Sequence, residues 1–254
     1  MARAWDSFDG PAGRLAVHVA PEVSASGPLT SAVVVLSHGF PLGAGAAEST
    51  GDNLPALADR LAAESGRCVV AGCFRGIGPS EGDFSLDGWL EDLGAFVSHG
   101  AGLVSGGGVW LVGFGTGGAL ALCLAAGDQR VRGVACFGSP ATFADWAQDT
   151  GGMLAFSRRV GVVRTPDYPP DAAAWADAFT RLRPDEAAAA VAPRPVLVVH
   201  GVEDDEVPLA DARVLADAVG GSAELRVIGG AGHRLRADPR AMALLVGWLE
   251  RQGP

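Results

Sequence analysis

Short apolar runs alternate with helical patterns along most of this chain, and this alternation is the feature that most restricts its fold. Runs of this kind occupy 32–37, 67–74, 109–112, 131–137 and 195–200. Their length and their many Val, Leu and Ala residues are typical of buried strands. Parallel strands need long connections, which are usually helices. The pattern therefore predicts an α/β fold with a mostly parallel sheet and helices on both of its faces.

Weaker patterns supply the remaining elements. The turn at 10–13 leads into a run at 14–19, which we expect to be an edge strand. Asp52 or Asn53 is expected to cap a helix that ends at Glu64. The other expected elements are helices at 86–97, 117–126, 209–219 and 239–252 and a strand at 223–228.

A stretch from about 142 to 191 interrupts the alternation. It is rich in Ala, Trp, Phe and Pro, and the strand pattern returns only at Pro195. We expect an inserted cap here that is small and mostly helical. The chain has no internal repeat, and its 254 residues are enough for one sizeable core. The sequence therefore predicts one domain over 1–254 that carries this insertion.

The charged residues exclude several function classes. The 19 basic residues are all Arg and stand against 29 Asp and Glu, for a net charge of −10. The absence of Lys excludes Schiff-base chemistry and the Walker lysine. No basic stripe is present to neutralise phosphates, so we expect no nucleic acid partner. Arg158, Arg159 and Arg164 of the insertion could grip an anionic substrate or lie in solvent. A small molecule is the expected ligand or substrate, and a homodimer stays open.

Neither a membrane location nor a metal site is expected. The uncharged stretch 101–127 is long enough to span a bilayer, but four glycines between 113 and 118 favour a strand, a turn and a helix instead. The N-terminus lacks the apolar segment of a signal peptide, and the four cysteines show no CxxC spacing. Buried thiols in a cytoplasmic protein are the expected outcome. No metal-ligand spacing is present, so no metal and no cofactor is predicted.

The turn at 113–118 fits two different motifs. As Gly113-x-Gly115-x-x-Gly118 it matches a dinucleotide-binding fingerprint, in which a pyrophosphate lies at a helix N-terminus. That fingerprint also needs an acidic residue about twenty positions later, and 131–141 contains neither Asp nor Glu. As G-x-S-x-G, the same turn is a nucleophile elbow whose third position has become Gly115.

Residues further along the chain favour the elbow. Asp204 follows the strand at 195–200, and His233 lies in a glycine-rich loop before the last helix. The order nucleophile, acid, histidine is that of α/β-hydrolases. An early strand ends in His38-Gly39, and 74–82 form an FRGxGxSxG loop. By these motifs the chain resembles the α/β-hydrolase family along nearly its whole length, and in particular its small bacterial members.

The resemblance implies an eight-stranded sheet and a catalytic triad. Asp204 would orient the imidazole of His233, which would act as general base. The neighbours of Asp204 are also acidic, and the spacing from the preceding strand favours Asp204. A serine nucleophile is expected at 115, and Gly115 has no side chain. Glycine suits the positive φ of an elbow, but it removes the chemistry of an acyl-enzyme cycle.

The same resemblance assigns the groups that would hold a substrate. The backbone amides of Phe40 and Thr116 would form the oxyanion hole, and the loop of Phe40 also contains His38 and Gly39. His38 and His200 end buried strands and are expected to support their loops through hydrogen bonds. The aromatic side chains of the insertion could contact an apolar ligand or pack on the sheet; they belong to Phe143, Trp146, Phe156, Tyr168, Trp175 and Phe179.

Several functions remain open. The chain could be a pseudoenzyme, an inactive hydrolase that binds a small apolar or mixed ligand or a partner. Asp204 and His233 could instead act as a dyad that deprotonates water or the substrate, as a hydrolase or a lyase. Thr116 could replace the missing nucleophile, although the role of its amide turns its side chain away from the apex. Nucleotide binding by 113–118 is a minor alternative.

Overall fold

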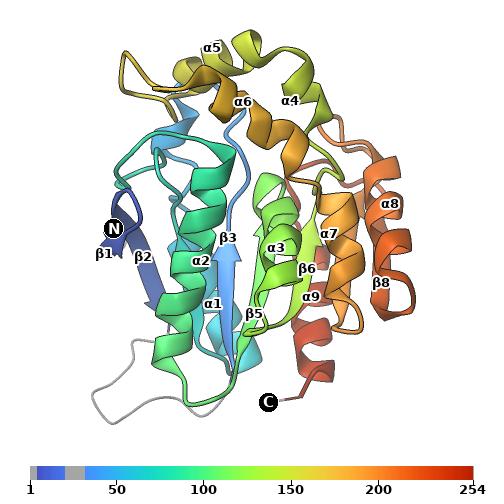
Figure 1. Cartoon of the computed structure of the whole chain (residues 1–254). Coiled ribbons are helices and arrows are strands. Elements are labelled where there is room, and N and C mark those ends of the chain that lie inside the picture. The colour runs from blue at the N-terminus through green and yellow to red at the C-terminus, as the bar shows by residue number, and fades with distance from the viewer. Residues whose placement is uncertain (1–4, 21–31, 254) are drawn as a thin grey trace.

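The computed structural model describes residues 5–20 and 32–253, which form a twisted sheet between layers of helices (Figure 1). In these residues the sheet has eight strands in the order β1-β2-β4-β3-β5-β6-β7-β8, and all pairs from β4 onward are parallel. The predicted mostly parallel, eight-stranded α/β sheet is therefore confirmed. The strands are β1 (Asp6–Gly10), β2 (Gly13–Ala20), β3 (Val33–Ser37), β4 (Val69–Gly72), β5 (Val109–Phe114), β6 (Val131–Phe137), β7 (Val196–Gly201) and β8 (Ala223–Ile228).

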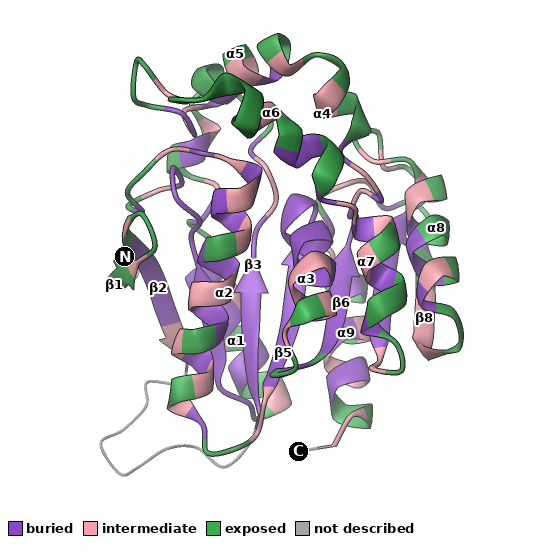
Figure 2. Ribbon diagram, viewed as in Figure 1, coloured by how far each residue is buried: buried purple, intermediate pink, exposed green. Residues whose placement is uncertain are grey.

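Helices cover both faces of the sheet, as the alternation predicts. One face packs against α1 (Leu54–Ser65) and α9 (Pro239–Arg251). The other face packs against α2 (Leu86–Leu103), α3 (Thr116–Gly127), α7 (Pro184–Val191) and α8 (Leu209–Val219). The strands β3, β4, β5, β6 and β7, in the middle of the sheet, are almost entirely buried (Figure 2). Two buried clusters of side chains, one on each face, thus hold the sheet in place.

The insertion after β6 contains α4 (Ala144–Gln148), α5 (Thr150–Val160) and α6 (Ala172–Arg181) before it reaches α7. Figure 1 shows α4, α5 and α6 above the end of the sheet at which the parallel strands stop. By contrast, α7 packs between α3 and α8 in the helical layer. The part of the segment 142–191 that covers the edge of the sheet is therefore α4–α6. Short 3₁₀ turns lie at Ala46–Glu48, Gly220–Ser222 and Leu235–Ala237.

Three local expectations are corrected by the structure. β2 is not the edge strand, because β1 pairs with it in an antiparallel hairpin. The five residues of β1 include two Asp and a Gly and give little strand signal. Asn53 precedes α1, but its side chain makes no capping hydrogen bond. The second helix continues to Leu103, beyond the expected end at 97, where Gly100 lets it pack closely on β3.

Two arginines hold the loop at 74–82 in place. The guanidinium of Arg75 pairs with the fully buried carboxylate of Asp92 on α2 at 2.7 Å, and its backbone N–H donates to the same side chain. Arg164 reaches down from the insertion and donates to the carbonyl oxygens of Gly76 and Gly78. The loop and the cap are thus tied to each other and to the helical layer. Within the described residues, no helix is both long and apolar enough to cross a membrane.

Candidate active site

A turn of one residue joins β5 to α3. Gly115 lies at its apex with φ of 52° and ψ of −126°, a conformation that strains any residue with a side chain. The crossing of strand and helix is equally tight, because a Cβ atom added to Gly113 would lie 2.4 Å from the Cα atom of Gly118. The glycines at 113 and 118 therefore allow the close approach, and Gly115 allows the turn itself.

Asp204 and His233 meet above this turn. Nδ1 of His233 lies 3.0 Å from Oδ2 of Asp204, whose side chain is completely buried. The other carboxylate oxygen of Asp204 accepts hydrogen bonds from the backbone N–H groups of Glu206 and Val207. Burial alone would raise the pKa of Asp204, but these hydrogen bonds and that to His233 outweigh it and lower this pKa. A carboxylate at Nδ1 favours the tautomer that carries its proton there and leaves Nε2 as the base.

The free nitrogen of His233 faces Gly115. A Cβ atom built on Gly115 would lie 3.6 Å from Nε2 of His233 and 3.4 Å from the Cα atom of Gly39. The second distance is an ordinary van der Waals contact, so the site has room for a small side chain. His233 rather than an open phosphate-binding space lies over the turn, and this favours the elbow over the nucleotide fingerprint.

The loop after β3 begins with His38 and places Gly39 and Phe40 beside the elbow. His38 is fully buried; its Nδ1–H donates to the carbonyl of Gly39, and its Nε2 accepts from the backbone N–H of Phe74. Burial, with help from Arg236, lowers the pKa of His38 to about 4 despite the bond to Gly39. His38 therefore positions the loop through both of its ring nitrogens, as expected for a histidine at the end of a buried strand.

A cavity of about 420 Å³ lies between this site and the cap, and we call it the capped cavity. Gly115, His233 and the two residues with the expected oxyanion amides, Phe40 and Thr116, all line it. Thr116 is the first residue of α3, where backbone N–H groups have no partner within the helix. The other residues that line the capped cavity are Leu42, Pro140, Thr142, Phe143, Asp145, Trp146, Phe156, Glu206, Val207, Pro208 and Asp211.

Five of the six aromatic residues of the insertion, all except Tyr168, divide into two groups. Phe143, Trp146 and Phe156 line the capped cavity, which places Trp146 where a ligand would contact it. Trp175 and Phe179 are buried and pack the cap onto the fold, and Nε1 of Trp175 donates to the carbonyl of Phe84. Sequence alone left both roles open for all of them, because ring type does not reveal which side of a cap faces the sheet.

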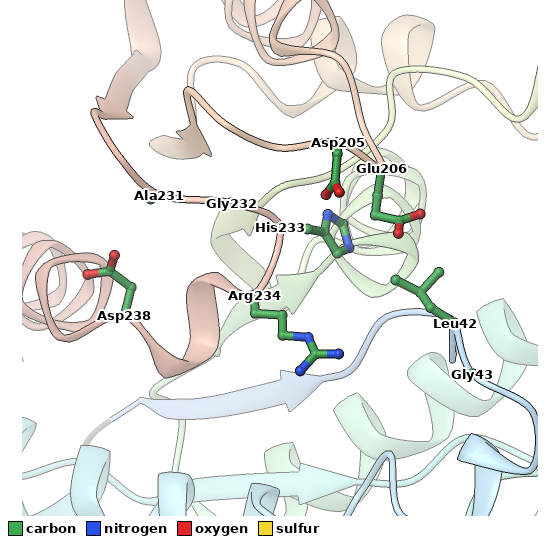
Figure 3. Close-up of a pocket in the computed structure, with 9 residues that line it drawn as sticks. All are labelled: Leu42, Gly43, Asp205, Glu206, Ala231, Gly232, His233, Arg234 and Asp238. Carbon is green, nitrogen blue, oxygen red and sulfur yellow. The ribbon is translucent and has the colours of Figure 1, made fainter.

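A second cavity of about 480 Å³ lies on the other side of His233, and we call it the outer cavity. Figure 3 shows the carboxylates of Asp205 and Glu206 beside the imidazole of His233, with Leu42 across from Glu206. Leu42, Glu206 and His233 line both cavities. His233 thus stands at the junction of an aromatic compartment and a polar one.

Two further residues support the site. His200 is fully buried, and its Nε2 lies 2.9 Å from the carbonyl oxygen of Val207 and 3.4 Å from Oδ2 of Asp204. It therefore supports the turn that carries Asp204, as its position at a strand end predicts. Gly138 was not expected here; a Cβ atom at this residue would lie 3.2 Å from the Asp204 carboxylate. Its place directly after a buried strand was the available signal.

Arg158, Arg159 and Arg164 of the insertion make contacts within the protein. Arg158 donates to the carbonyl oxygens of Pro166 and Tyr168, and Arg164 to those of the loop at 74–82. The guanidinium of Arg159 lies 4.8 Å from the centre of the Phe156 ring.

All four cysteines are free thiols; three are buried and Cys123 is half-buried. Among the described residues, no cluster of His, Cys, Asp or Glu side chains is suited to hold a metal ion.

The histidine–carboxylate pair lies above a strand-to-helix turn, at the carboxyl edge of a mostly parallel eight-stranded sheet. This arrangement defines the class of proteins with the serine-hydrolase type of α/β fold. Residues 34–244 match the Alpha/beta hydrolase family. The chain therefore belongs to the alpha/beta hydrolase family, and the resemblance seen in its motifs is confirmed.

Solved structures agree with this fold over the whole chain. Alpha/beta hydrolase GrgF from Penicillium sp. sh18 is 17% identical with a TM-score of 0.71, and 99% of each chain is covered. Est1E from Butyrivibrio proteoclasticus is 17% identical with a TM-score of 0.70, covering 98% of this chain and 97% of that one. An alpha-beta serine hydrolase homologue from Coxiella burnetii is 21% identical with a TM-score of 0.63, covering 100% and 99%. Comparison with curated protein sequences gives no match.

Proposed function

We propose that this protein binds a small apolar or mixed ligand in the capped cavity and has lost the acyl-enzyme cycle of its family. The observation that carries this proposal is Gly115 at the apex of the elbow, with its Cβ position 3.6 Å from Nε2 of His233. This is the place from which a nucleophilic side chain would meet the base. Glycine offers no atom there that could form a covalent intermediate.

The loss of the nucleophile removes most of the catalytic power of such a site. When one member of a serine triad is removed, roughly 10³ to 10⁴ of rate enhancement over water survives, from the oxyanion hole and binding alone. The capped cavity itself stays open, with a volume of about 420 Å³ that is in the range of small-molecule sites. Its aromatic lining and adjoining polar groups fit a ligand with both apolar and polar parts.

A second candidate function is acid–base catalysis by Asp204 and His233 without a nucleophile. It is favoured by the 3.0 Å contact between the two side chains, because a pure binding site has no need of an oriented base. In this case Nε2 of His233 would deprotonate a water lodged where the missing side chain would lie, or a carbon or hydroxyl of the ligand. The water would then attack a carbonyl directly.

Hydrolysis of p-nitrophenyl acetate and butyrate by the unmodified protein separates the two candidates. We expect rates near background that do not change in His233→Ala. Robust hydrolysis that disappears in His233→Ala would favour the dyad instead. Hydrolysis that survives His233→Ala but disappears in Thr116→Val would assign the nucleophile to Thr116, the third interpretation of the sequence.

A further inference from the structure

The charged groups around the capped cavity all have the same sign. Its lining includes three acidic residues, Asp145, Glu206 and Asp211, and no arginine. The chain contains no lysine at all. Asp211 accepts a hydrogen bond from the backbone N–H of Ala141 and is thereby held at the wall. A ligand in this cavity therefore meets acidic side chains and no basic side chain of Lys or Arg among the lining residues.

Aromatic rings form the other part of the lining. The ring of Phe40 lies at the centre of this group, 5.2 Å from Trp146 in an edge-on arrangement and 5.8 Å from Phe156 in a stacked one. Phe143 lies 5.3 Å from Trp146. The faces of aromatic rings attract cations, and they also accept apolar groups. Rings together with carboxylates form a surface that favours positively charged organic groups over anions.

The outer cavity extends this surface beyond His233. Asp205 and Glu206 lie beside the imidazole there, as Figure 3 shows. Asp238 also lines it but is paired with Arg240 at 2.7 Å. The one arginine in its lining is Arg234. Glu206 is the carboxylate that lines both cavities, so it stands nearest to any group that passes from one compartment to the other past His233.

The arginines of the insertion do not reverse this balance. Arg158 and Arg164 donate to backbone carbonyl oxygens, and neither lines the capped or the outer cavity. Arg159 contacts the ring of Phe156 and is likewise absent from the lining. Their engagement also removes the groups that could have held a carboxylate or phosphate ligand at the cap.

From this arrangement we propose that the ligand is an organic cation, an ammonium group on an apolar or aromatic body. The apolar body lies among Phe40, Trp146 and Phe156, and the ammonium group lies against Glu206 at the junction of the two cavities. The proposal rests on the proposed function, because it names the chemical class that the same site takes. It adds a charge preference that ligand binding in the capped cavity does not by itself require.

Three probes of similar size test the charge preference. Dissociation constants are measured by ligand-observed NMR titration for 2-phenylethylammonium, 2-phenylethanol and phenylacetate at neutral pH and low salt. We expect the ammonium to bind about tenfold more tightly than the alcohol, and the carboxylate to bind most weakly. Higher ionic strength is expected to reduce the preference for the ammonium, because Glu206 is exposed to solvent.

Matched variants locate the effect. Glu206→Gln is expected to weaken binding of the ammonium by about three- to tenfold and to leave the alcohol unchanged. Glu203→Gln removes the same charge three residues earlier, outside both linings, and should change none of the three constants. Trp146→Ala should weaken all three probes, because each places its ring in the capped cavity.

The outcomes separate this inference from the proposed function. Binding of the alcohol or of phenylacetate as tightly as the ammonium, with loss in Trp146→Ala, would leave ligand binding in place and overturn the charge preference. Ammonium binding that does not respond to Glu206→Gln, or that responds equally to Glu203→Gln, would also overturn it. Binding of none of the three probes would contradict both proposals.

Discussion

Nδ1 of His233 lies 3.0 Å from Oδ2 of Asp204, although the two residues belong to different loops 29 positions apart. They meet because β7 and β8 are parallel neighbours whose carboxyl ends reach the same edge of the sheet. The carboxylate is buried and held by two backbone N–H groups, so the imidazole is oriented with Nε2 toward Gly115. The base and its orienting acid are thus in place beside an elbow that has no side chain.

The buried pair of Arg75 and Asp92 is expected to be the most sensitive ionic contact of the fold. Asp92→Asn leaves the guanidinium of Arg75 nearly buried without its carboxylate, and should lower the free energy of unfolding by about 3 to 5 kcal/mol. Glu91→Gln is the matched control, because Glu91 contacts the same guanidinium but its side chain is 59% exposed. It should cost less than about 1 kcal/mol. Urea unfolding measures both; equal losses would contradict this account of the loop.

His38 predicts how stability depends on pH. Its pKa falls from 6.5 to about 4 in the native protein, so the unfolded chain takes up the proton first as the pH is lowered. Stability should therefore decrease between pH 6.5 and 4, by about 2 kcal/mol from pH 7 to pH 5. Burial also lowers the pKa of His99, so this residue makes stability decrease with falling pH in the same way. The lowered pKa of Asp204 reduces stability only when the pH falls below the ordinary value of 3.8 for this group.

The variant His38→Gln tests the assignment of this pH dependence. Its stability at neutral pH is expected to be lower, because the hydrogen bonds to Gly39 and Phe74 are disturbed. The change in unfolding free energy from pH 7 to pH 5 should nevertheless shrink by most of the contribution of His38. An unchanged slope in urea titrations at the two pH values would assign the effect to other groups.

Much of the fold could be predicted from sequence because the parallel strands are continuous apolar runs between helical segments. β3, β5, β6 and β7 are buried along nearly their whole length, and their composition reports this directly. β1 carries no such signal, since it lies at the edge and has no fully buried residue. Its pairing with β2 depends on the hairpin rather than on its own composition.

The candidate site was predictable in part for a similar reason. Strand ends and glycine turns identified Gly115, Asp204 and His233, and their meeting follows from parallel topology. Asp204 stood among four consecutive acidic residues, and only its hydrogen bonds to the backbone N–H groups of Glu206 and Val207 show why its carboxylate turns inward. The outer cavity could not be predicted, because its walls come from loops after three different strands.

Because β5 and α3 pack closely, substitution of two glycines of α3 by alanine should change stability by very different amounts. A Cβ atom at Gly118 would lie 2.1 Å from Oγ of Ser139 and 2.8 Å from the carbonyl oxygen of Gly113, so Gly118→Ala should destabilise the protein by about 1 to 3 kcal/mol. Gly127 has nothing within 4 Å of the same position, and Gly127→Ala should be neutral or stabilise by up to about 1 kcal/mol. Thermal unfolding of both variants checks this; similar effects would mean that the two elements do not cross closely at Gly118.

The most direct test of the central claim is the rate of p-nitrophenyl acetate hydrolysis by Gly115→Ser, compared with Gly115→Ala. Both variants place a side chain at φ of 52° and should lose about 1 to 3 kcal/mol of stability. If only the nucleophile is missing, Gly115→Ser should exceed Gly115→Ala by on the order of 100-fold, and the gain should disappear when His233→Ala is added. A folded Gly115→Ser variant that is no faster than Gly115→Ala would contradict the claim that the base, the acid and the oxyanion amides are still arranged for acyl transfer.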